Sequence, residues 1–342
     1  MSDLPTAPAS PPGPAEPGAT DVGSTAVVDA GPPGPAPHPG MVWVPGGTFL
    51  MGSDDHYPEE APAHRVTVAG LWMDRLAATN DDFARFVRAT GHVTVAERAP
   101  DPADYPDARP DLLVAASSVF RKPGRPVSLD DAYRWWALVP GADWRHPRGP
   151  QSSIRDLGDH PVVHVAWSDV EAYAAWAGKQ LPTEAEWERA ARGGLEGAEF
   201  AWGDELVPGG RHMANWWQGD FPNHNSRDDG FEYSAPAKSF PPNGFGLFQM
   251  TGNVWEWTSD WYQDRAAGAP EHACCAVPDP RGGTRDGSVV AGDPAAVPRK
   301  VMKGGSHLCA PSYCRRYRPA ARMAQAVDTS TSHLGFRCVV RP

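Results

Sequence analysis

An alternation of apolar and polar residues begins at Met41 and marks the first predicted element of the chain. Residues 41–53 read Met-Val-Trp-Val-Pro-Gly-Gly-Thr-Phe-Leu-Met-Gly-Ser. Successive side chains of a strand point to opposite faces, so two short alternating runs are typical of strands, and the glycine pair between them is typical of a turn. The pattern predicts a β-hairpin that turns at Gly46 and Gly47.

Apolar spacing and terminal capping residues predict three helices. Thr79 caps the first, which covers residues 80–90 and stops at Gly91. The other two span residues 168–177 and 183–192. Each opens with a capping box, in which a Ser or Thr and an acidic residue three positions later bond reciprocally to backbone amides. A glycine follows the last residue of all three helices, where it can adopt the left-handed conformation that ends a helix.

Loops dominate the chain after residue 195. Glycine and proline are frequent, with 35 and 38 residues, and both interrupt regular elements. Hydrophobic residues make up 41% of the chain, which is enough for a real core. No repeat of fixed period is present. These features predict one α+β domain over residues 41–342 with little regular secondary structure.

Residues 1–40 differ in composition from the rest of the chain. They contain eleven prolines, six glycines and four acidic residues, and no Lys or Arg. Such a segment has too little apolar surface to offset the entropy that is lost on folding. It is predicted to be a disordered tail, with a docking arm as the alternative.

The net charge of −11 restricts the classes of partner. It disfavours nucleic acids, because no basic stripe is present to displace counterions from phosphates, and it weakly favours a cationic substrate. No apolar run approaches the roughly 20 residues that cross a bilayer. The N-terminus has neither the basic nor the apolar region of a secretory signal. A cytoplasmic location is therefore expected.

The five cysteines are an odd and sparse set, which is not a disulfide framework. Cys309 and Cys314 lie five residues apart across a proline-containing turn, which can bring both sulfurs to one point. Two buried thiols, a redox-active disulfide and a metal site all remain open for this pair. Zinc would need four ligands, whereas two soft thiolates in low coordination suit copper(I). Three nearby arginines favour thiolate over thiol, namely Arg315, Arg316 and Arg318.

Residues 304–318 read Gly-Gly-Ser-His-Leu-Cys-Ala-Pro-Ser-Tyr-Cys-Arg-Arg-Tyr-Arg. This segment resembles the active-site segment of formylglycine-generating enzymes, the catalytic members of the sulfatase-modifying factor family. Other family blocks occur in order along the chain, and they include residues 44–49, 160–167, 181–188, 241–247, 252–257 and 335–337. Non-catalytic relatives share those blocks. The cysteine pair with its flanking Gly-Gly-Ser and Arg-Tyr-Arg residues is therefore the feature that distinguishes the catalytic members. The His-x-x-x-His-x-Glu iron motif of the sulfoxide-synthase relatives is missing from the sequence.

The resemblance implies the fold of this family, which is a variant of the C-type-lectin-like architecture. It also implies a copper(I)-dependent oxidation by O2 that converts the cysteine of a Cys-x-Pro-x-Arg motif in an unfolded sulfatase polypeptide to Cα-formylglycine. A thiol reductant and a monomeric enzyme are expected. Two rivals remain, a non-catalytic binding module on the same fold and a thiol–disulfide oxidoreductase, although the latter typically carries Cys-x-x-Cys at a helix N-terminus.

By resemblance, Cys309 and Cys314 hold one copper(I) ion and are catalytic. Ser306 and Tyr313 match polar groups beside the metal, and Trp255 matches an aromatic wall of the pocket. A turn residue is the alternative for Ser306, and core packing is the alternative for Tyr313 and Trp255.

Other matched positions depart from the family pattern. Ser330 matches a serine of the family, whereas His333 stands where the family usually has asparagine. The role of His333 is open: it could be a metal ligand, a proton donor or a structural histidine. Cys338 matches a half-cystine of secreted members, but Ala174 and Ala191 stand in place of its partners, so a free buried thiol is expected. The Cys274–Cys275 pair has no matching family role.

Calcium is the second metal that the resemblance implies, bound by hard oxygen ligands from loops. The first site combines two side chains with two backbone carbonyls, from Asn215, Asp229, Trp216 and Phe231. The second site likewise combines side chains and carbonyls, from Gln249, Glu256, Gly252 and Val254. The family usually has asparagine in place of Gln249, which puts the second site in doubt.

Overall fold

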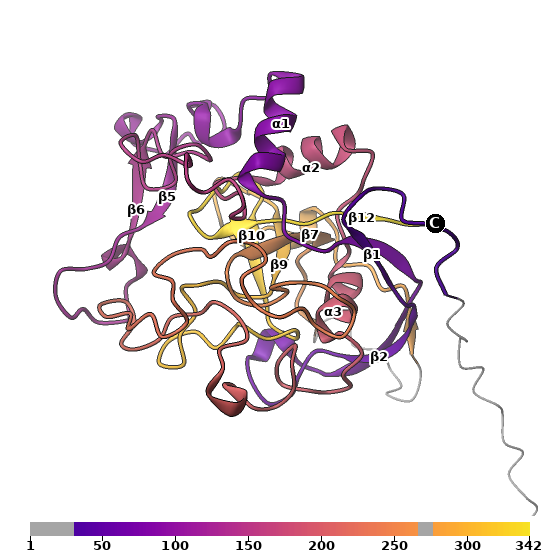
Figure 1. Cartoon of the computed structure of the whole chain (residues 1–342). Helices are drawn as coiled ribbons and strands as arrows, with labels where there is room; N and C mark the ends of the chain where they lie inside the picture. Colours follow the sequence, from indigo (N-terminus) through magenta and orange to yellow (C-terminus); the bar gives the residue numbers. More distant parts are fainter. Residues whose placement is uncertain (1–30, 266–275) are drawn as a thin grey trace, which may run out of the picture.

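The computed structural model describes residues 31–265 and 276–342, and Figure 1 shows their course. Residues 1–30 of the predicted tail (1–40) and the Cys274–Cys275 pair lie outside the described residues. Residues 31–40 contain no helix or strand and lead directly into β1. None of the helices in the described ranges has the length and apolar character needed to span a bilayer.

The strands of the described chain form four small sheets. The four-stranded sheet has the order β10-β9-β7-β11 and lies near the centre of Figure 1. Its strands are β7 (Trp255–Trp261), β9 (Arg299–Lys303), β10 (Arg322–Ala326) and β11 (Leu334–Gly335). β9 is antiparallel to both of its neighbours, and β11 is parallel to β7.

Three smaller sheets surround this centre. The first contains β1 (Met41–Val44), β4 (Leu71–Asp74) and β12 (Val339–Val340). The second contains β2 (Gly47–Met51), β3 (His64–Val68) and β8 (Val277–Pro278). The third is the antiparallel pair of β5 (Ala116–Phe120) and β6 (Trp136–Pro140), which lies on the opposite side of Figure 1 from β1 and β2.

The predicted hairpin over residues 41–53 is wrong in its pairing. Both strands exist, but β1 pairs with β4 and β2 pairs with β3, so the chain changes sheets at the glycine pair. A side chain at Gly46 would lie 2.6 Å from the backbone nitrogen of Gly70, and Gly47 has a φ of 140°. The corner therefore needs glycine for close backbone approach rather than for a hairpin turn.

The helices α1 (Asn80–Thr90) and α3 (Glu184–Arg192) confirm two of the three predictions. Thr79 and Thr183 each accept a hydrogen bond from the third helical amide, and an acidic side chain completes each capping box. Gly91 and Gly193 adopt the left-handed conformation that ends the helix. Local sequence signals are sufficient here because every group in a cap lies within a few residues of the others.

The helix α2 (Trp167–Trp176) begins one residue earlier than predicted. Ala166, not Ser168, is its cap, and the Asp169 carboxylate accepts a hydrogen bond of 2.9 Å from the Ala166 amide. The acidic residue at the third helical position thus supplies the reciprocal half of a capping box without any hydroxyl at the cap. The predicted pairing of Ser168 with Glu171 is wrong.

Loops contribute large aromatic side chains to the core. Between α3 and β7 the described chain contains no α-helix and no strand, yet Trp216, Trp217 and Phe240 are buried. Trp255 and Trp257 of β7 add to the same interior. Large rings supply much buried area per residue, so a loop-rich chain can still form a core. The predicted loop-rich α+β domain is confirmed.

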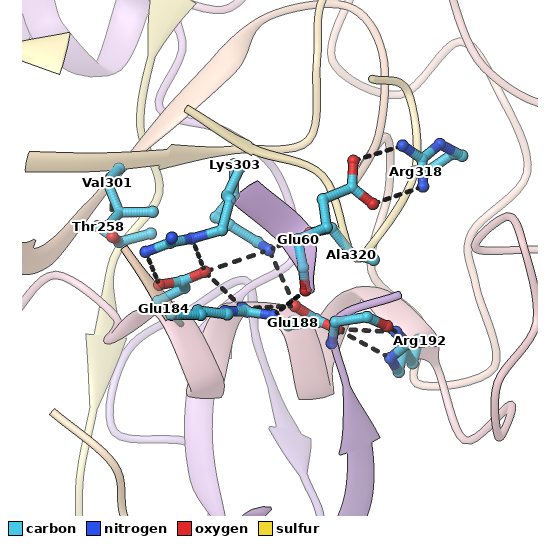
Figure 2. Close-up of polar contacts among 12 residues, drawn as sticks. Glu60, Glu184, Glu188, Arg192, Thr258, Val301, Lys303, Arg318 and Ala320 are labelled. Carbon is cyan, nitrogen blue, oxygen red and sulfur yellow. Dashed lines mark hydrogen bonds and ion pairs between the residues drawn. The ribbon is translucent and has the colours of Figure 1, made fainter. Parts of the chain in front are cut away.

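A buried cluster of ion pairs joins α3 to the central sheet (Figure 2). Glu188 accepts hydrogen bonds from Lys303 at 2.9 Å and from Arg192 at 2.8 Å. Glu184 accepts hydrogen bonds from Arg322 and Arg265, both at 2.8 Å. Lys303 is the last residue of β9 and is fully buried. The cluster therefore fixes the end of β9 from which the candidate site begins.

Candidate active site

The two cysteine sulfurs of the predicted site lie together. Cys309 Sγ is 3.2 Å from Cys314 Sγ, and both side chains are buried and free. A turn forms between them, in which the amides of Tyr313 and Cys314 both donate to the carbonyl of Ala310. A disulfide bond would place the sulfurs about 2.05 Å apart, so the observed contact is a hydrogen bond between the two sulfurs.

The cysteine segment is held by a close backbone approach behind it. Gly305 has a φ of 70°, and a side chain there would lie 2.5 Å from the carbonyl oxygen of Arg316. The glycine turn after Lys303 thus folds the chain against the segment that follows Cys314. The residues before and after the two cysteines therefore pack against each other, and this packing helps to hold the sulfurs together.

Cys314 is the more acidic thiol of the pair. The hydrogen bond from Cys309 and the positive charge of Arg316 lower the pKa of Cys314, against the opposing effect of burial. Burial raises the pKa of the Cys309 thiol, and the neighbouring Cys314 raises it further. Of the two sulfurs, Cys314 is therefore the one that loses its proton more readily.

Of the three arginines predicted to favour thiolate, Arg316 contacts the site directly. Its Nη1 lies 3.6 Å from Cys314 Sγ. Arg315 instead pairs with Glu199 at 2.8 Å, and the Arg318 guanidinium pairs with the buried carboxylate of Glu60.

The sulfurs lie on the wall of a cavity of about 360 Å³. One side of the cavity is aromatic, with Trp135, Trp136 and Phe221. Tyr313 stacks on Phe221 with ring centroids 4.4 Å apart and remains 40% exposed, so it stands at the opening. Trp255, which was predicted as an aromatic wall, also lines the cavity. A space of this size is in the range that binds organic ligands.

Ser306 and His333 form a hydrogen-bonded pair in the same cavity. Ser306 Oγ lies 2.9 Å from His333 Nδ1 and accepts a hydrogen bond from the Leu308 amide at 3.2 Å. Burial lowers the pKa of His333 to about 3, so the imidazole is neutral. Its ring packs against Trp136 with centroids 4.8 Å apart. His333 thus orients the Ser306 hydroxyl and faces the cavity.

Ser330 belongs to a neighbouring polar cluster outside that cavity. Its hydroxyl lies 2.7 Å from Ser117 Oγ, which in turn lies 2.6 Å from His164 Nδ1. Burial lowers the pKa of His164 to about 4. These groups form the wall behind the site.

Three of the four residues predicted for the first calcium site are neighbours, and the Asp229 carboxylate fits a hard cation. Asp229 Oδ1 accepts a hydrogen bond from the Phe231 amide at 2.9 Å, and the backbone of Trp216 lies close enough to lower the pKa of this carboxylate. Asp229 Oδ2 is buried without a hydrogen-bond partner among the described residues. Asn215 is buried, and its side-chain nitrogen donates to the carbonyl of Tyr233 at 2.8 Å. Burial raises the pKa of Asp229. A buried carboxylate oxygen without a donor is costly unless a cation compensates it.

The second predicted calcium set has one free oxygen and one paired carboxylate. Gln249 Oε1 is buried without a hydrogen-bond partner among the described residues. Both oxygens of Glu256 accept from the Arg337 guanidinium at 2.7 Å, and one also accepts from the Trp187 indole at 2.7 Å. A calcium ion bound by Glu256 would therefore share this carboxylate with Arg337, and the second set stays a prediction.

No group of three or more His, Cys, Asp or Glu side chains converges as a metal cluster within residues 31–265 and 276–342. A metal at the cysteine pair would therefore depend on two thiol ligands. Cys338 does not line the cavity and is a free and fully buried thiol, which confirms its prediction. It packs in one apolar cluster with Ala174.

The sequence analysis missed the partners that long-range folding brings to the site. Trp135 and Trp136 precede the cysteines by more than 170 residues, and Phe221 comes from a loop. Their one available signal was the adjacent pair of tryptophans, because exposed or half-buried aromatic pairs often line clefts. Glu59 and Tyr57, which contact Arg316, gave no signal in the sequence.

Comparison with known proteins agrees with this geometry. A model of the sulfatase-modifying factor enzyme 1-like domain matches residues 29–342. The formylglycine-generating enzyme of Mycobacterium tuberculosis is 52% identical, over 88% of this chain and 98% of its own length. That of Thermomonospora curvata is 47% identical, over 89% and 94% respectively.

A solved structure supports the fold. PvdO from Pseudomonas aeruginosa superposes with a TM-score of 0.54 at 25% identity and covers 87% of this chain and 93% of its own. The match extends over almost all of the described residues, so the domain is similar as a whole. The chain belongs to the sulfatase-modifying factor family and is an enzyme of the formylglycine-generating kind.

Proposed function

We propose that this chain activates sulfatases as a copper(I)-dependent oxidase, which converts the cysteine of a Cys-x-Pro-x-Arg segment to Cα-formylglycine with O2. One observation carries the proposal. Two free sulfurs lie 3.2 Å apart on the wall of a cavity of about 360 Å³, and Arg316 lies 3.6 Å from one of them. The unfolded sulfatase segment is the substrate, and the enzyme acts in the cytoplasm as a monomer.

Cys309 and Cys314 would hold the copper ion. Their sulfurs are soft ligands, which suit a soft monovalent cation. Copper(I), when bound, supplies the redox chemistry by which O2 oxidises the substrate cysteine. With two protein ligands and a cavity beside them, the site leaves room for the substrate thiol.

The other cavity residues bind and orient the substrate. The aromatic side, with Trp135, Trp136 and Tyr313, offers apolar surface to the peptide and excludes water from the reacting carbon. The Ser306 hydroxyl, oriented by the neutral His333, is one of the polar groups that line the cavity with the sulfurs. This arrangement assigns positioning to Ser306 and His333 and does not use His333 as an acid, because its pKa lies near 3.

The overall reaction balances when a thiol reductant supplies two electrons. The substrate CH2–SH group and O2, with two further electrons and two protons, give an aldehyde, hydrogen sulfide and water. O2 takes four electrons, of which the substrate carbon supplies two and the reductant supplies two. The C–S bond breaks when water adds to the oxidised carbon and sulfide leaves.

The proposal is tested by incubating the copper-loaded protein with a Cys-x-Pro-x-Arg peptide, O2 and a thiol reductant. The expected product is lighter than the peptide by about 18 Da, the formula difference between cysteine and formylglycine in this oxidation. A peptide with serine in place of cysteine is the matched control and should keep its mass. A mixed disulfide with the enzyme would instead indicate a thiol–disulfide oxidoreductase, and an unchanged, bound peptide would indicate a binding module.

Calcium at the Asn215–Asp229 site is a second part of the proposal. Added calcium should raise the melting temperature of the protein, and at a concentration of ~100 times Kd the gain in unfolding free energy should be about 2.7 kcal/mol. Asp229→Asn should abolish the gain, because it removes the charge of the carboxylate whose Oδ2 is buried without a partner. Thermal melts with calcium or with EGTA measure the effect.

Asp228→Asn is the control for this prediction, since Asp228 is the exposed neighbour in the same loop. It should keep the full calcium response. A wild-type melting temperature that is the same in calcium and in EGTA would refute calcium binding at this site.

A further inference from the structure

Three arginines follow Cys314, and each is held by a different carboxylate. The pairs are Arg315–Glu199, Arg316–Glu59 and Arg318–Glu60. Among these arginines, Arg316 is the one that lines the cavity and lies 3.6 Å from the Cys314 sulfur. Its carboxylate partner is therefore in a position to control the charge that the site presents to its ligands.

Two residues fix the orientation of the Arg316 guanidinium. Glu59 Oε1 accepts hydrogen bonds from Nη2 at 2.6 Å and from Nε at 3.2 Å, which occupies one edge of the group. The Tyr57 ring lies beneath it, with the guanidinium carbon 3.7 Å from the ring centroid. With one edge and one face held, the remaining nitrogen, Nη1, is directed at Cys314 Sγ.

The segment that carries Tyr57 and Glu59 is itself anchored. The carbonyl of Glu59 accepts a hydrogen bond from Arg322 at 3.2 Å, and that of Glu60 accepts one from Arg265 at 2.9 Å. Both arginines bond to Glu184 of α3, in the buried cluster shown in Figure 2. The backbone at Glu59 is thus held in place by two arginines, and this fixes the position from which its carboxylate reaches Arg316.

The Arg316–Glu59 pair is also less exposed to solvent than the Arg315–Glu199 pair. The side chains of Arg316 and Glu59 are 19% and 21% exposed, compared with 46% and 28% for Arg315 and Glu199. Partial shielding strengthens charge interactions relative to exposed pairs. The difference makes Glu199 a natural control, because it holds an arginine that does not contact the sulfur.

We propose that Glu59, together with the Tyr57 ring, is a positioning residue for the oxidation, acting through Arg316. The inference rests on the proposed function. Two thiolates and one monovalent cation carry a net charge of −1, and a directed guanidinium offsets that charge in a buried site. Without Glu59, the long Arg316 side chain would regain several rotamers and leave this charge uncompensated for part of the time.

The test compares Glu59→Gln with Glu199→Gln. For Glu59→Gln, kcat should fall roughly ten- to hundredfold, as a misplaced catalytic group can cost about 10². The KM for the peptide should stay within about threefold, because the aromatic wall is intact. Copper(I) affinity, measured by competition with a chelator, should fall about tenfold from the lost charge compensation. Glu199→Gln should change each quantity by less than about twofold, and Glu59→Asp should recover part of the loss.

The affinity measurement separates this inference from the proposed function. If the wild type neither binds copper(I) nor oxidises the peptide, the proposed function fails and the inference fails with it. If the wild type does both and Glu59→Gln matches Glu199→Gln, the inference alone is overturned. Should Glu59→Gln not fold, Tyr57→Leu removes the supporting ring instead, and unchanged affinity and kcat in that variant would likewise overturn the inference.

Discussion

Serine in place of either Cys309 or Cys314 is expected to lower turnover of the Cys-x-Pro-x-Arg peptide by at least ~10³-fold, and the double variant should lose little more than each single one. Serine keeps the size of the side chain, so the turn should fold, but its oxygen is a hard ligand that binds a soft monovalent ion poorly. The losses should not add, because the two sulfurs act as one unit. Initial rates by mass spectrometry measure the effect.

Cys338→Ala is the control for the serine variants. Cys338 is also a free and fully buried thiol, but unlike Cys309 and Cys314 it does not line the cavity. This variant should keep its turnover. A single serine variant that keeps a tenth of the wild-type rate would contradict the shared-ligand assignment, and so would losses that multiply in the double variant.

The sequence predicted those features whose determinants are local. The caps of α1 and α3 were placed correctly because Thr79 and Thr183 meet their bonding partners within three residues. The pairing of β1 and β2 was wrong for the opposite reason. Alternation identifies a strand and its buried face but contains no information about which distant strand completes the ladder, and here β4 and β3 do so.

The same limit applies to the site. The five-residue spacing of Cys309 and Cys314 was a sufficient basis for expecting that their sulfurs could meet, because one turn holds both. The identity of the arginine that reaches the sulfur was not predictable, since Glu59 selects it from more than 250 positions away. Glu256 shows the converse, because a carboxylate in a matching motif is bound instead by Arg337, 81 residues later.

Removing the buried charge of Glu188 is expected to have the largest effect on stability. Glu188→Gln should lower the free energy of unfolding by about 3–5 kcal/mol, because it leaves Arg192 buried without its countercharge and Lys303 with Glu184 alone, at 3.7 Å. Glutamine keeps the shape and can still accept the hydrogen bond from the Gly52 amide. Urea unfolding at neutral pH, followed by tryptophan fluorescence, measures the change.

The matched control is Glu196→Gln, which removes a carboxylate from an exposed pair with Arg65. Both side chains of that pair are 51% exposed, and such pairs contribute about 0–1 kcal/mol. If the two variants lose equal stability, the buried cluster does not hold the end of β9 as the structure indicates.

The pH dependence of the Glu188→Gln effect follows from the same contacts. Burial alone would raise the pKa of Glu188, but Lys303, Arg192 and Arg265 lower it to about 2, below its ordinary value of 4.5. A depressed pKa in the folded state stabilises the protein above the pKa of the unfolded state, and this contribution is lost as the pH falls toward the folded value. The stability difference between wild type and variant should therefore be full at pH 7 and shrink between about pH 4.5 and pH 2. A difference that stays constant over that range would show that lost packing, and not lost charge, destabilises the variant.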